Sequence, residues 1–326
     1  MPQTSGPIIV TGAAGFIGSH VCQALLARGQ RVIGIDNFDP FYDAAAKARN
    51  IDAVQKAAGS AGAFELVRAD ICDADAMNAL HALSKPVGII HLAAKAGVRP
   101  SIADPVGYTR ANVLGTSVLL EAARRAGVAR FVMASSSSVY GNNAKVPFSE
   151  DDDVSGPVSP YAATKRSCEL IAHSHWHLNR IPTACLRFFT VFGPRQRPDL
   201  AISQFLGRVS RGEEVPMFGD GRSSRDYTFV DDVVRGVIAS YDRIDRFGYR
   251  IWNLGGNAPV ALSEMIATIA RTVGKEARIK SLPTQPGDVE RTWADLSRSA
   301  AELDYSPATP FDEGVARQWA WSKSLA

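Results

Sequence analysis

The chain has 326 residues, 46% of them hydrophobic and 21% charged, a composition typical of a globular protein with one large or two modest domains. The net charge of +3 is small and Lys and Arg are scattered, which argues against a nucleic-acid or membrane-surface partner. No apolar run approaches the ~20 residues that span a bilayer, and the N-terminus lacks a signal-peptide pattern. The four cysteines form no CxxC motif, so we expect free thiols and a cytoplasmic protein.

The first half of the chain alternates short β-branched runs with longer helical patterns. We predict strands at 8–11, 31–36, 65–70, 88–92 and 130–135. We predict helices between them at 16–28, 45–58, 74–83 and 105–126. This alternation indicates a parallel sheet covered by helices on both faces.

The regular alternation of strands and helices ends in the second half of the chain. A helix at 161–179 and a strand at 183–189 come first, followed by a helix at 231–241, a strand at 249–254 and helices near 263–273 and 312–323. Two stretches rich in Gly, Pro and Arg, GPRQRPDLA and MFGDGRSSRDYTF, are predicted to be ligand-holding loops. We therefore expect one domain from 1–187 plus about 229–258, and a smaller interleaved domain from about 188–228 plus 259–326.

The first predicted strand runs into VTGAAGFIGSH, where Gly12, Gly15 and Gly18 form GxxGxxG before a helix. Glycines let backbone amides approach a pyrophosphate, and the helix N-terminus favours negative charge. Asp36 follows about 20 residues later, where a carboxylate accepts both ribose hydroxyls of NAD and repels the 2′-phosphate of NADP. The adjacent Asn37 offers no positive charge to a 2′-phosphate, which also favours NAD over NADP. The fold class predicted is a doubly wound parallel (Rossmann) α/β sheet with a smaller interleaved C-terminal α/β substrate domain.

The motif YAATK places Tyr161 and Lys165 four residues apart, on one face of the predicted helix. An ammonium group beside a phenol favours the phenolate, which can take a proton from a sugar hydroxyl beside a nicotinamide. A Tyr-x-x-x-Lys motif by itself is common by chance, and it can also be an ordinary pair on an amphipathic helix.

Taken together, the glycine triplet, the serine run of MASSSSVYGN and YAATK resemble the extended short-chain dehydrogenase/reductase family. FGDGRSSRDYTFVDDVV, NLGG and QPGDVERTWADLS are similar to nucleotide-sugar epimerases. Within these, DNFDPFYD, AGVRPS and FTVFGPRQRP are most similar to UDP-glucuronate 4-epimerases. The resemblance covers nearly the whole chain and implies NAD-dependent 4-epimerisation of a UDP-hexuronate through a transient 4-keto intermediate.

The resemblance also implies roles for individual residues. Tyr161 is the expected base and acid, Lys165 its partner at the nicotinamide ribose, and Ser136 the hydroxyl on the substrate 4-oxygen. Asn112 is expected near the pyrophosphate, and Asp70 near the adenine or, equally, as a turn cap. The expected NAD contacts are Gly12, Gly15, Phe16, Ile17, Gly18, Asp36, Asn37, Asp70, Ile71, Leu92, Ala93 and Lys165. The expected contacts to the UDP-sugar are Arg99, Ser138, Thr190, Arg197, Phe218, Arg225 and Asp288.

The absence of an acid in the serine run bears on the reaction. Related 4,6-dehydratases carry Asp-Glu, and UDP-glucuronate decarboxylases a Glu, where this chain has Ser137 and Ser138. We therefore expect epimerisation without elimination of water. The alternatives left open are a 4-epimerase for UDP-glucose or UDP-N-acetylglucosamine, a UDP-glucuronate decarboxylase, and a non-catalytic sensor of NAD or UDP-sugar.

Two further features have simpler interpretations. His173 and His177 in HSHWHLN could chelate a metal, but no third ligand has suitable spacing, so we expect no metal. Related enzymes dimerise through this helix and the preceding one, so we expect a homodimer. His91 is expected to be a hydrogen-bonded core histidine.

Overall fold

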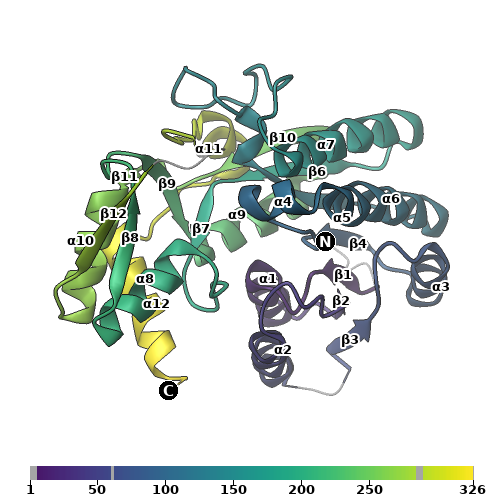
Figure 1. The fold of residues 1–326 in the computed structure, drawn as a ribbon. Helices are drawn as coiled ribbons and strands as arrows, with labels where there is room; N and C mark the ends of the chain where they lie inside the picture. The colour runs from purple at the N-terminus through teal and green to yellow at the C-terminus, as the bar shows by residue number, and fades with distance from the viewer. Residues whose placement is uncertain (1–5, 60–61, 284–288, 326) are drawn as a thin grey trace. The chain divides into compact units, whose positions relative to one another are not determined.

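The computed structural model describes residues 6–59, 62–283 and 289–325, which form two compact units (Figure 1). The first unit comprises Met1–Gly141, Asp153–Arg187 and Val234–Trp252. The second comprises Asn142–Asp152, Phe188–Val233 and Asn253–Ala326. Each unit is therefore assembled from segments that are distant in the sequence.

The centre of the first unit is a seven-stranded sheet of order β10-β6-β5-β4-β1-β2-β3. Neighbours β1–β2, β1–β4, β2–β3 and β4–β5 pair in parallel. The strands are β1 (Ile8–Thr11), β2 (Val32–Asp36), β3 (Phe64–Arg68), β4 (Gly88–His91), β5 (Phe131–Ser136), β6 (Thr183–Phe188) and β10 (Tyr249–Leu254). The order reverses between β1 and β4, the point where doubly wound folds bind dinucleotides. The predicted fold class is confirmed.

The helices of this unit form two groups (Figure 1). Helix α1 (Phe16–Ala27) packs on α2 (Ala44–Ala58), whereas α6 (Gly115–Ala126) packs between α3 (Ala74–Ser84) and α7 (Pro160–Asn179). Buried side chains of α6 and α7 share a core with alternate strand residues such as Ile9, Ile33 and Ile89. The remaining elements are α4 (Val98–Ala103), α5 (Pro105–Tyr108), the π-helix η1 (Thr109–Leu114), the 3₁₀ helices η2 (Ser137–Tyr140) and η3 (Ile244–Arg246), and α9 (Val230–Arg243).

The helix predicted at 105–126 is present over its whole length, but its middle part η1, between α5 and α6, is a π-helix. A Cβ on Gly115 would lie 2.5 Å from the Ile71 side chain, so the chain passes close to the connection after β3. The Asn112 side chain meanwhile bonds to the backbone of Lys95. These tertiary contacts accompany the π-helical part of a segment whose local pattern is uniformly helical.

The second unit contains a three-stranded sheet of order β11-β9-β7 and a parallel pair of β12 and β8. Its strands are β7 (Thr190–Phe192), β8 (Glu214–Phe218), β9 (Ser224–Phe229), β11 (Pro259–Ala261) and β12 (Arg278–Leu282). Its helices are α8 (Ala201–Arg211), α10 (Leu262–Val273), α11 (Ser297–Leu303) and α12 (Phe311–Lys323). The prediction of a loop through SSRDYTF was wrong, because this backbone pairs with both β7 and β11.

Candidate active site

The glycine motif forms a tight turn between β1 and α1. Gly12 has a φ of +70°, and a Cβ on it would lie 2.8 Å from the Ala93 amide nitrogen. A Cβ on Gly18 would lie 2.0 Å from the Gly12 carbonyl oxygen. Gly15 caps α1 without a side-chain hydrogen bond, so Phe16 and Ile17 begin a helix whose first amides are left for another acceptor. This turn fits a pyrophosphate against the helix N-terminus.

Asp36 lies at the end of β2 with its carboxylate buried. It accepts hydrogen bonds from the amides of Ala14 (3.1 Å) and Phe38 (2.8 Å). The Lys47 ammonium lies 3.5 Å from the same carboxylate. Asn37 is exposed, and its side chain accepts a bond from the Asp39 amide. Sequence reasoning found the carboxylate and missed its cation, because a helix residue 11 positions later carries no motif.

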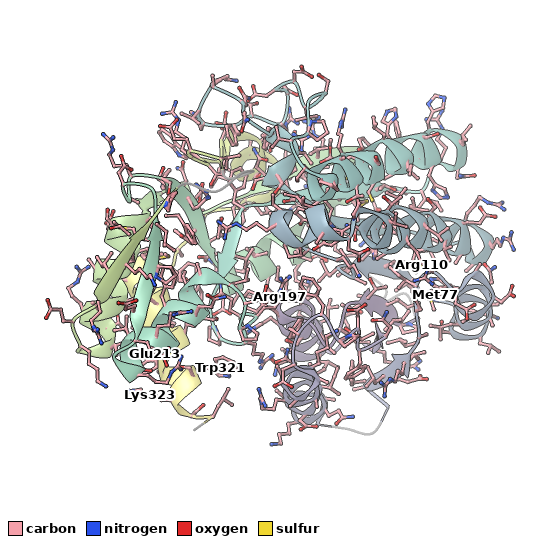
Figure 2. The ribbon with its side chains drawn as sticks, in the orientation of Figure 1. Met77, Arg110, Arg197, Glu213, Trp321 and Lys323 are labelled. Atoms are coloured by element: carbon pink, nitrogen blue, oxygen red, sulfur yellow. The ribbon has the colours of Figure 1, made fainter. Side chains whose placement is uncertain are left out.

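Asp70 follows β3 and acts as a turn cap in the structure. Its carboxylate accepts the Cys72 amide at 2.9 Å and pairs with Arg110 at 3.1 Å (Arg110 is labelled in Figure 2). Partial burial opposes ionisation of Asp70, but the Cys72 amide and Arg110 together lower its pKa. Ile71 packs under Gly115. The proposed adenine contact stays a prediction.

Leu92 and Ala93 follow β4 and are held by a buried chain of hydrogen bonds. Both amides donate to Thr11 Oγ1, at 3.2 and 3.1 Å. That hydroxyl lies 2.7 Å from His91 Nδ1, while His91 Nε2 lies 3.0 Å from Thr116 Oγ1. Thr116 donates its own proton to the Asn112 carbonyl, so His91 donates from Nε2 and accepts at Nδ1. His91 is thus a hydrogen-bonded core histidine, as predicted.

Tyr161 and Lys165 lie in the first turns of α7, which packs against β5 and η2. The helix begins here because Ser159 accepts the Ala162 amide and Pro160 occupies the first turn. The Tyr161 ring meets Tyr108 edge to face at 6.2 Å. The Lys165 ammonium is buried and donates to the Ala134 carbonyl at 2.8 Å. This bond holds Lys165 beside the end of β5, where Ser136 lies.

Ser136 ends β5 and caps η2. Its hydroxyl accepts the Ser138 amide at 3.1 Å and lies 3.1 Å from the Ser138 hydroxyl. The serine run therefore presents two coupled hydroxyls at the carboxyl edge of the sheet, on the segment that supplies the Lys165 partner. Arg99 is exposed on α4, in the same unit.

A buried ion pair supports this region. Glu169, one turn beyond Lys165, accepts hydrogen bonds from Arg187 (2.9 and 3.0 Å), Arg166 (3.0 Å) and the Ser135 hydroxyl (2.7 Å). Burial opposes ionisation of Glu169, but Arg187, Ser135 and Arg166 together lower its pKa below the ordinary value. The Arg187 guanidinium lies 4.8 Å from the centre of the Tyr140 ring in η2. Sequence reasoning missed this cluster, whose members come from four elements.

Asn112, which was expected near the pyrophosphate, bonds in the structure to Lys95, a residue that sequence reasoning missed. The Asn112 side chain accepts the Lys95 amide (2.8 Å) and donates to the Lys95 carbonyl and Thr164 hydroxyl (both 3.0 Å). It thereby ties the segment after β4 to α7. Asn112 lies in the π-helix η1, and π-helices are frequent at functional sites. The sequence alone does not reveal a π-helix, so this indication appears only with the backbone.

The predicted sugar contacts of the second unit lie on or beside its strands. Thr190 begins β7, Phe218 ends β8 half-buried, and Arg225 lies on β9, where it donates to the Ser224 carbonyl at 2.9 Å. The Arg197 fork (labelled in Figure 2) pairs with Asp199, with Nε 3.0 Å from Oδ1. Asp288 lies outside the described residues.

Neither a metal-binding cluster nor a membrane-spanning helix is present in the part of the chain that the structure describes. There, no group of three His, Cys, Asp or Glu side chains is placed to hold a metal ion. His173 instead stacks edge to face on Tyr249 at 4.9 Å. Within the same residues no helix has the length and apolarity to cross a membrane.

Comparison with known proteins decides the family. The family model described as GDP-mannose 4,6 dehydratase matches residues 9–318. The chain belongs to this family. Its similarity to a probable UDP-glucuronate 4-epimerase of Rhizobium meliloti is 39% identity, covering 96% of both proteins. A UDP-glucuronate 4-epimerase of Thermodesulfobacterium geofontis is 38% identical, covering 98% of this chain and 96% of the relative.

Solved structures also match nearly the whole chain. UDP-glucuronic acid 4-epimerase from Bacillus cereus, solved with UDP-glucuronic acid and NAD, superposes with a TM-score of 0.91 at 36% identity, covering 98% of this chain and all of the other. UDP-glucose 4-epimerase from Thermotoga maritima superposes with a TM-score of 0.89 at 30% identity, covering 98% of this chain and all of the other. The resemblance to extended short-chain dehydrogenases is thus confirmed.

Proposed function

We propose that this protein is an NAD-dependent 4-epimerase that interconverts UDP-glucuronate and UDP-galacturonate. The observation that carries the proposal is full-length similarity, in sequence and in fold, to UDP-glucuronate 4-epimerases. The Thermotoga UDP-glucose 4-epimerase supports the alternative of a neutral hexose substrate, but it is less similar in sequence, at 30% identity. The first unit holds NAD and the second holds much of the UDP-sugar.

NAD, when bound, accepts the hydride of sugar C4 and returns it to the opposite face of the ring. Gly12, Gly15 and Gly18 with the first turn of α1 hold the pyrophosphate, and Asp36 holds the adenine ribose. Tyr161 removes the proton of the 4-hydroxyl and later returns it. Lys165 favours the tyrosinate and binds the nicotinamide ribose, while Ser136 orients the 4-oxygen. One of the three N–H bonds of Lys165 is directed to Ala134, which fixes its position.

The substrate's carboxylate makes the reaction demanding, because oxidation at C4 produces a β-keto acid that loses CO2 easily. The protein suppresses this loss by holding the carboxylate so that the C–C bond stays near the plane of the ketone. Arg99, Ser138, Thr190 and Arg197 are the proposed holders. Arginine suits this role because its planar fork bonds both carboxylate oxygens.

Proton NMR of the sugar tests the function directly. Purified protein is incubated with UDP-glucuronate, without added NAD. We expect UDP-galacturonate to appear and the same mixture to be reached from either sugar. Stoichiometric CO2 would indicate a decarboxylase, whereas turnover of UDP-glucose or UDP-N-acetylglucosamine alone would indicate a hexose epimerase. A sensor would bind UDP-sugar without turnover even with added NAD.

A homodimer and a cytoplasmic location are part of this proposal. Val106 and Leu114 are 78% and 47% exposed, and they line a shallow, mostly apolar hollow with Pro105 and Val113. Leu170 of the neighbouring helix α7 is exposed as well. A second copy of the chain would cover this apolar surface. The four cysteines are free thiols, which suits the reducing cytoplasm.

A further inference from the structure

Two buried glutamine side chains bond to each other at the loop that carries Arg197. Gln196 is 6% exposed and Gln318 is 1% exposed. Gln318 lies on α12, 122 positions later in the sequence, and its Nε2 donates to Gln196 Oε1 at 2.8 Å. Glutamine is mostly exposed in proteins, and a buried amide needs hydrogen-bond partners. This pair therefore raises the question of what it holds in place.

The Gln318 amide uses its acceptor and both of its donors. Its oxygen accepts the Gly193 amide at 2.8 Å, and its nitrogen donates to the Ser203 hydroxyl at 3.0 Å as well as to Gln196. The Gln196 oxygen also accepts the Ser203 amide (3.2 Å) and hydroxyl (2.9 Å). The Gln196 nitrogen donates to the Val191 carbonyl at 3.1 Å. One buried network therefore joins the loop to β7, α8 and α12 of the second unit.

The loop that this network holds has an uncommon backbone. The φ angle is +135° at Gly193 and +67° at Arg195, in a region that residues other than glycine rarely adopt. An arginine with such a φ costs free energy and persists only where its surroundings hold it. Arg197 comes two residues later, with a side chain that is 14% exposed and paired with Asp199. The conformation of the loop thus sets where the Arg197 guanidinium lies (Figure 2).

We propose that Gln318 is a positioning residue for substrate selection, which holds the loop of residues 193–200 so that Arg197 meets the carboxylate of the sugar. This inference rests on the proposed function. Gln318 acts through the backbone of Gly193 and the side chain of Gln196, and it needs no contact with the sugar. Without its amide, two buried polar groups of the loop each lose a partner, and the loop shifts to recover them. The affinity for a uronate then falls, whereas the affinity for a neutral sugar is retained.

Calorimetric binding of UDP-glucuronate and UDP-glucose tests this role. The two ligands differ only in the group on C5 of the sugar, so the ratio of their Kd values measures recognition of the carboxylate. NAD-loaded protein carrying Tyr161→Phe is used throughout, so that neither sugar is converted. We expect Gln318→Met to lower the preference for UDP-glucuronate at least about 5-fold and to change the Kd of UDP-glucose less than about 2-fold.

A second substitution shows whether Gln318 acts through Arg197. If it does, Gln318→Met should have no further effect on the preference in a protein that already carries Arg197→Met, because the two residues are coupled. Additive effects of the two substitutions would overturn the proposal. An intact preference in the Arg197→Met variant alone would overturn it as well.

Val315→Ala is the matched control for a purely structural effect. Val315 is fully buried on the same helix, so its truncation destabilises α12 without removing a hydrogen bond of the network. The preference should be unchanged in this variant, and an equal loss in Val315→Ala and Gln318→Met would contradict the proposal. If Gln318→Met does not fold, Ser203→Ala replaces it. That variant loses one hydroxyl of the network and should lower the preference in the same direction, whereas an unchanged preference would refute the role of the network.

The outcomes separate the two levels of inference. If the protein with Gln318 intact binds UDP-glucose as tightly as UDP-glucuronate, the proposed uronate function itself is refuted. A clear preference for UDP-glucuronate that survives Gln318→Met would overturn only the role of Gln318.

Discussion

Tyr161 and Arg197 have different surroundings in the structure. Tyr161 lies in a well-capped helix turn, where the Ser101 hydroxyl accepts its backbone amide at 3.1 Å and Tyr108 packs on its ring. Arg197 lies in a loop, where Asp199 occupies its fork. The fold therefore holds Tyr161 in one place. Arg197 is paired with a carboxylate of the same chemistry as that of the substrate.

Replacement of Tyr161 by Phe should abolish turnover and preserve binding. The ring remains, so its packing on Tyr108 is kept, but the proton carrier is lost. We expect kcat to fall about 1,000-fold, within the usual range for general acid–base groups. NMR turnover and calorimetric binding of UDP-glucuronate measure the two effects. Loss of binding in the folded variant would contradict this role.

Replacement of Arg197 by Met should distinguish a uronate from a neutral sugar. Loss of a charge-assisted fork corresponds to about a 10-fold or greater rise in KM for UDP-glucuronate. Any turnover of UDP-glucose should change far less. Arg211→Met is the control, because Arg211 forms a comparable pair with Glu213 two residues later. Equal effects of the two substitutions would leave no carboxylate role for Arg197.

At the scale of elements, the positions of the proposed catalytic groups depend on how α7 is fixed to the sheet. Lys165 and Glu169 lie one turn apart and bond to successive residues of β5, the Ala134 carbonyl and the Ser135 hydroxyl. Arg187 on β6 completes the attachment. This clamp sets the register of the helix against the strand, and hence the place of Tyr161 relative to Ser136.

Replacement of Ser135 by Ala should therefore lower both stability and turnover. It leaves the buried Glu169 without one of its donors, which costs about 1–3 kcal/mol of unfolding free energy. The matched control is Ser167→Ala, since Ser167 lies on the same helix as Glu169 and its hydroxyl donates to the Ala163 carbonyl. The free energy of unfolding, measured with urea, and kcat should both fall more in Ser135→Ala than in Ser167→Ala. Restoration of both by Ser135→Thr would assign the effect to the hydroxyl.

The hydrogen-bonded His91 predicts a pH dependence of stability. Burial, aided by the positive charge of Lys165, lowers the pKa of His91 to about 3, below the ordinary 6.5. The folded state stays neutral while the unfolded state gains a proton, so stability is complete above pH 6.5 and is lost as the pH falls toward 3. Between about pH 7.5 and about pH 5 this amounts to about 2 kcal/mol. Urea midpoints at both pH values should fall further in the native protein than in His91→Gln.

At the scale of the whole molecule, each unit is completed by distant parts of the chain. Strand β10 joins the first sheet beside β6, although sixty residues separate them in the sequence. The aromatic core of the second unit joins Phe192, Tyr227 and Phe229 with Phe311 of the last helix. A chain assembled in this way cannot be divided at one point into two folding segments.

Leu114→Glu should convert the proposed dimer into a monomer. A carboxylate in the centre of an apolar contact would be desolvated on association, which weakens binding strongly. Light scattering coupled to gel filtration gives the mass. Leu83→Glu is the control, because Leu83 is 84% exposed on α3, away from the hollow. A native protein that is already monomeric would refute the dimer.

Local patterns in the sequence determined the elements whose cause is local. The run from β1 through the glycine turn to α1 and β2 was predicted because β-branched residues, glycine spacing and helical period all act within a few residues. Tyr161 and Lys165 were placed on one helix face for the same reason. The sequence has serines at 137 and 138, where related dehydratases carry acids. Epimerisation without elimination of water was therefore expected before the structure was known.

Only the tertiary structure decided the contacts between segments that lie far apart. No spacing rule predicts the π-helical form of η1, the pairing of β9, the approach of Lys47 to Asp36 or the joining of Glu169 to Arg187. In each, the partner is set by how helices and strands pack, and packing depends on the whole buried surface. A carboxylate can be found from its motif, but the cation beside it appears only when the chain is folded.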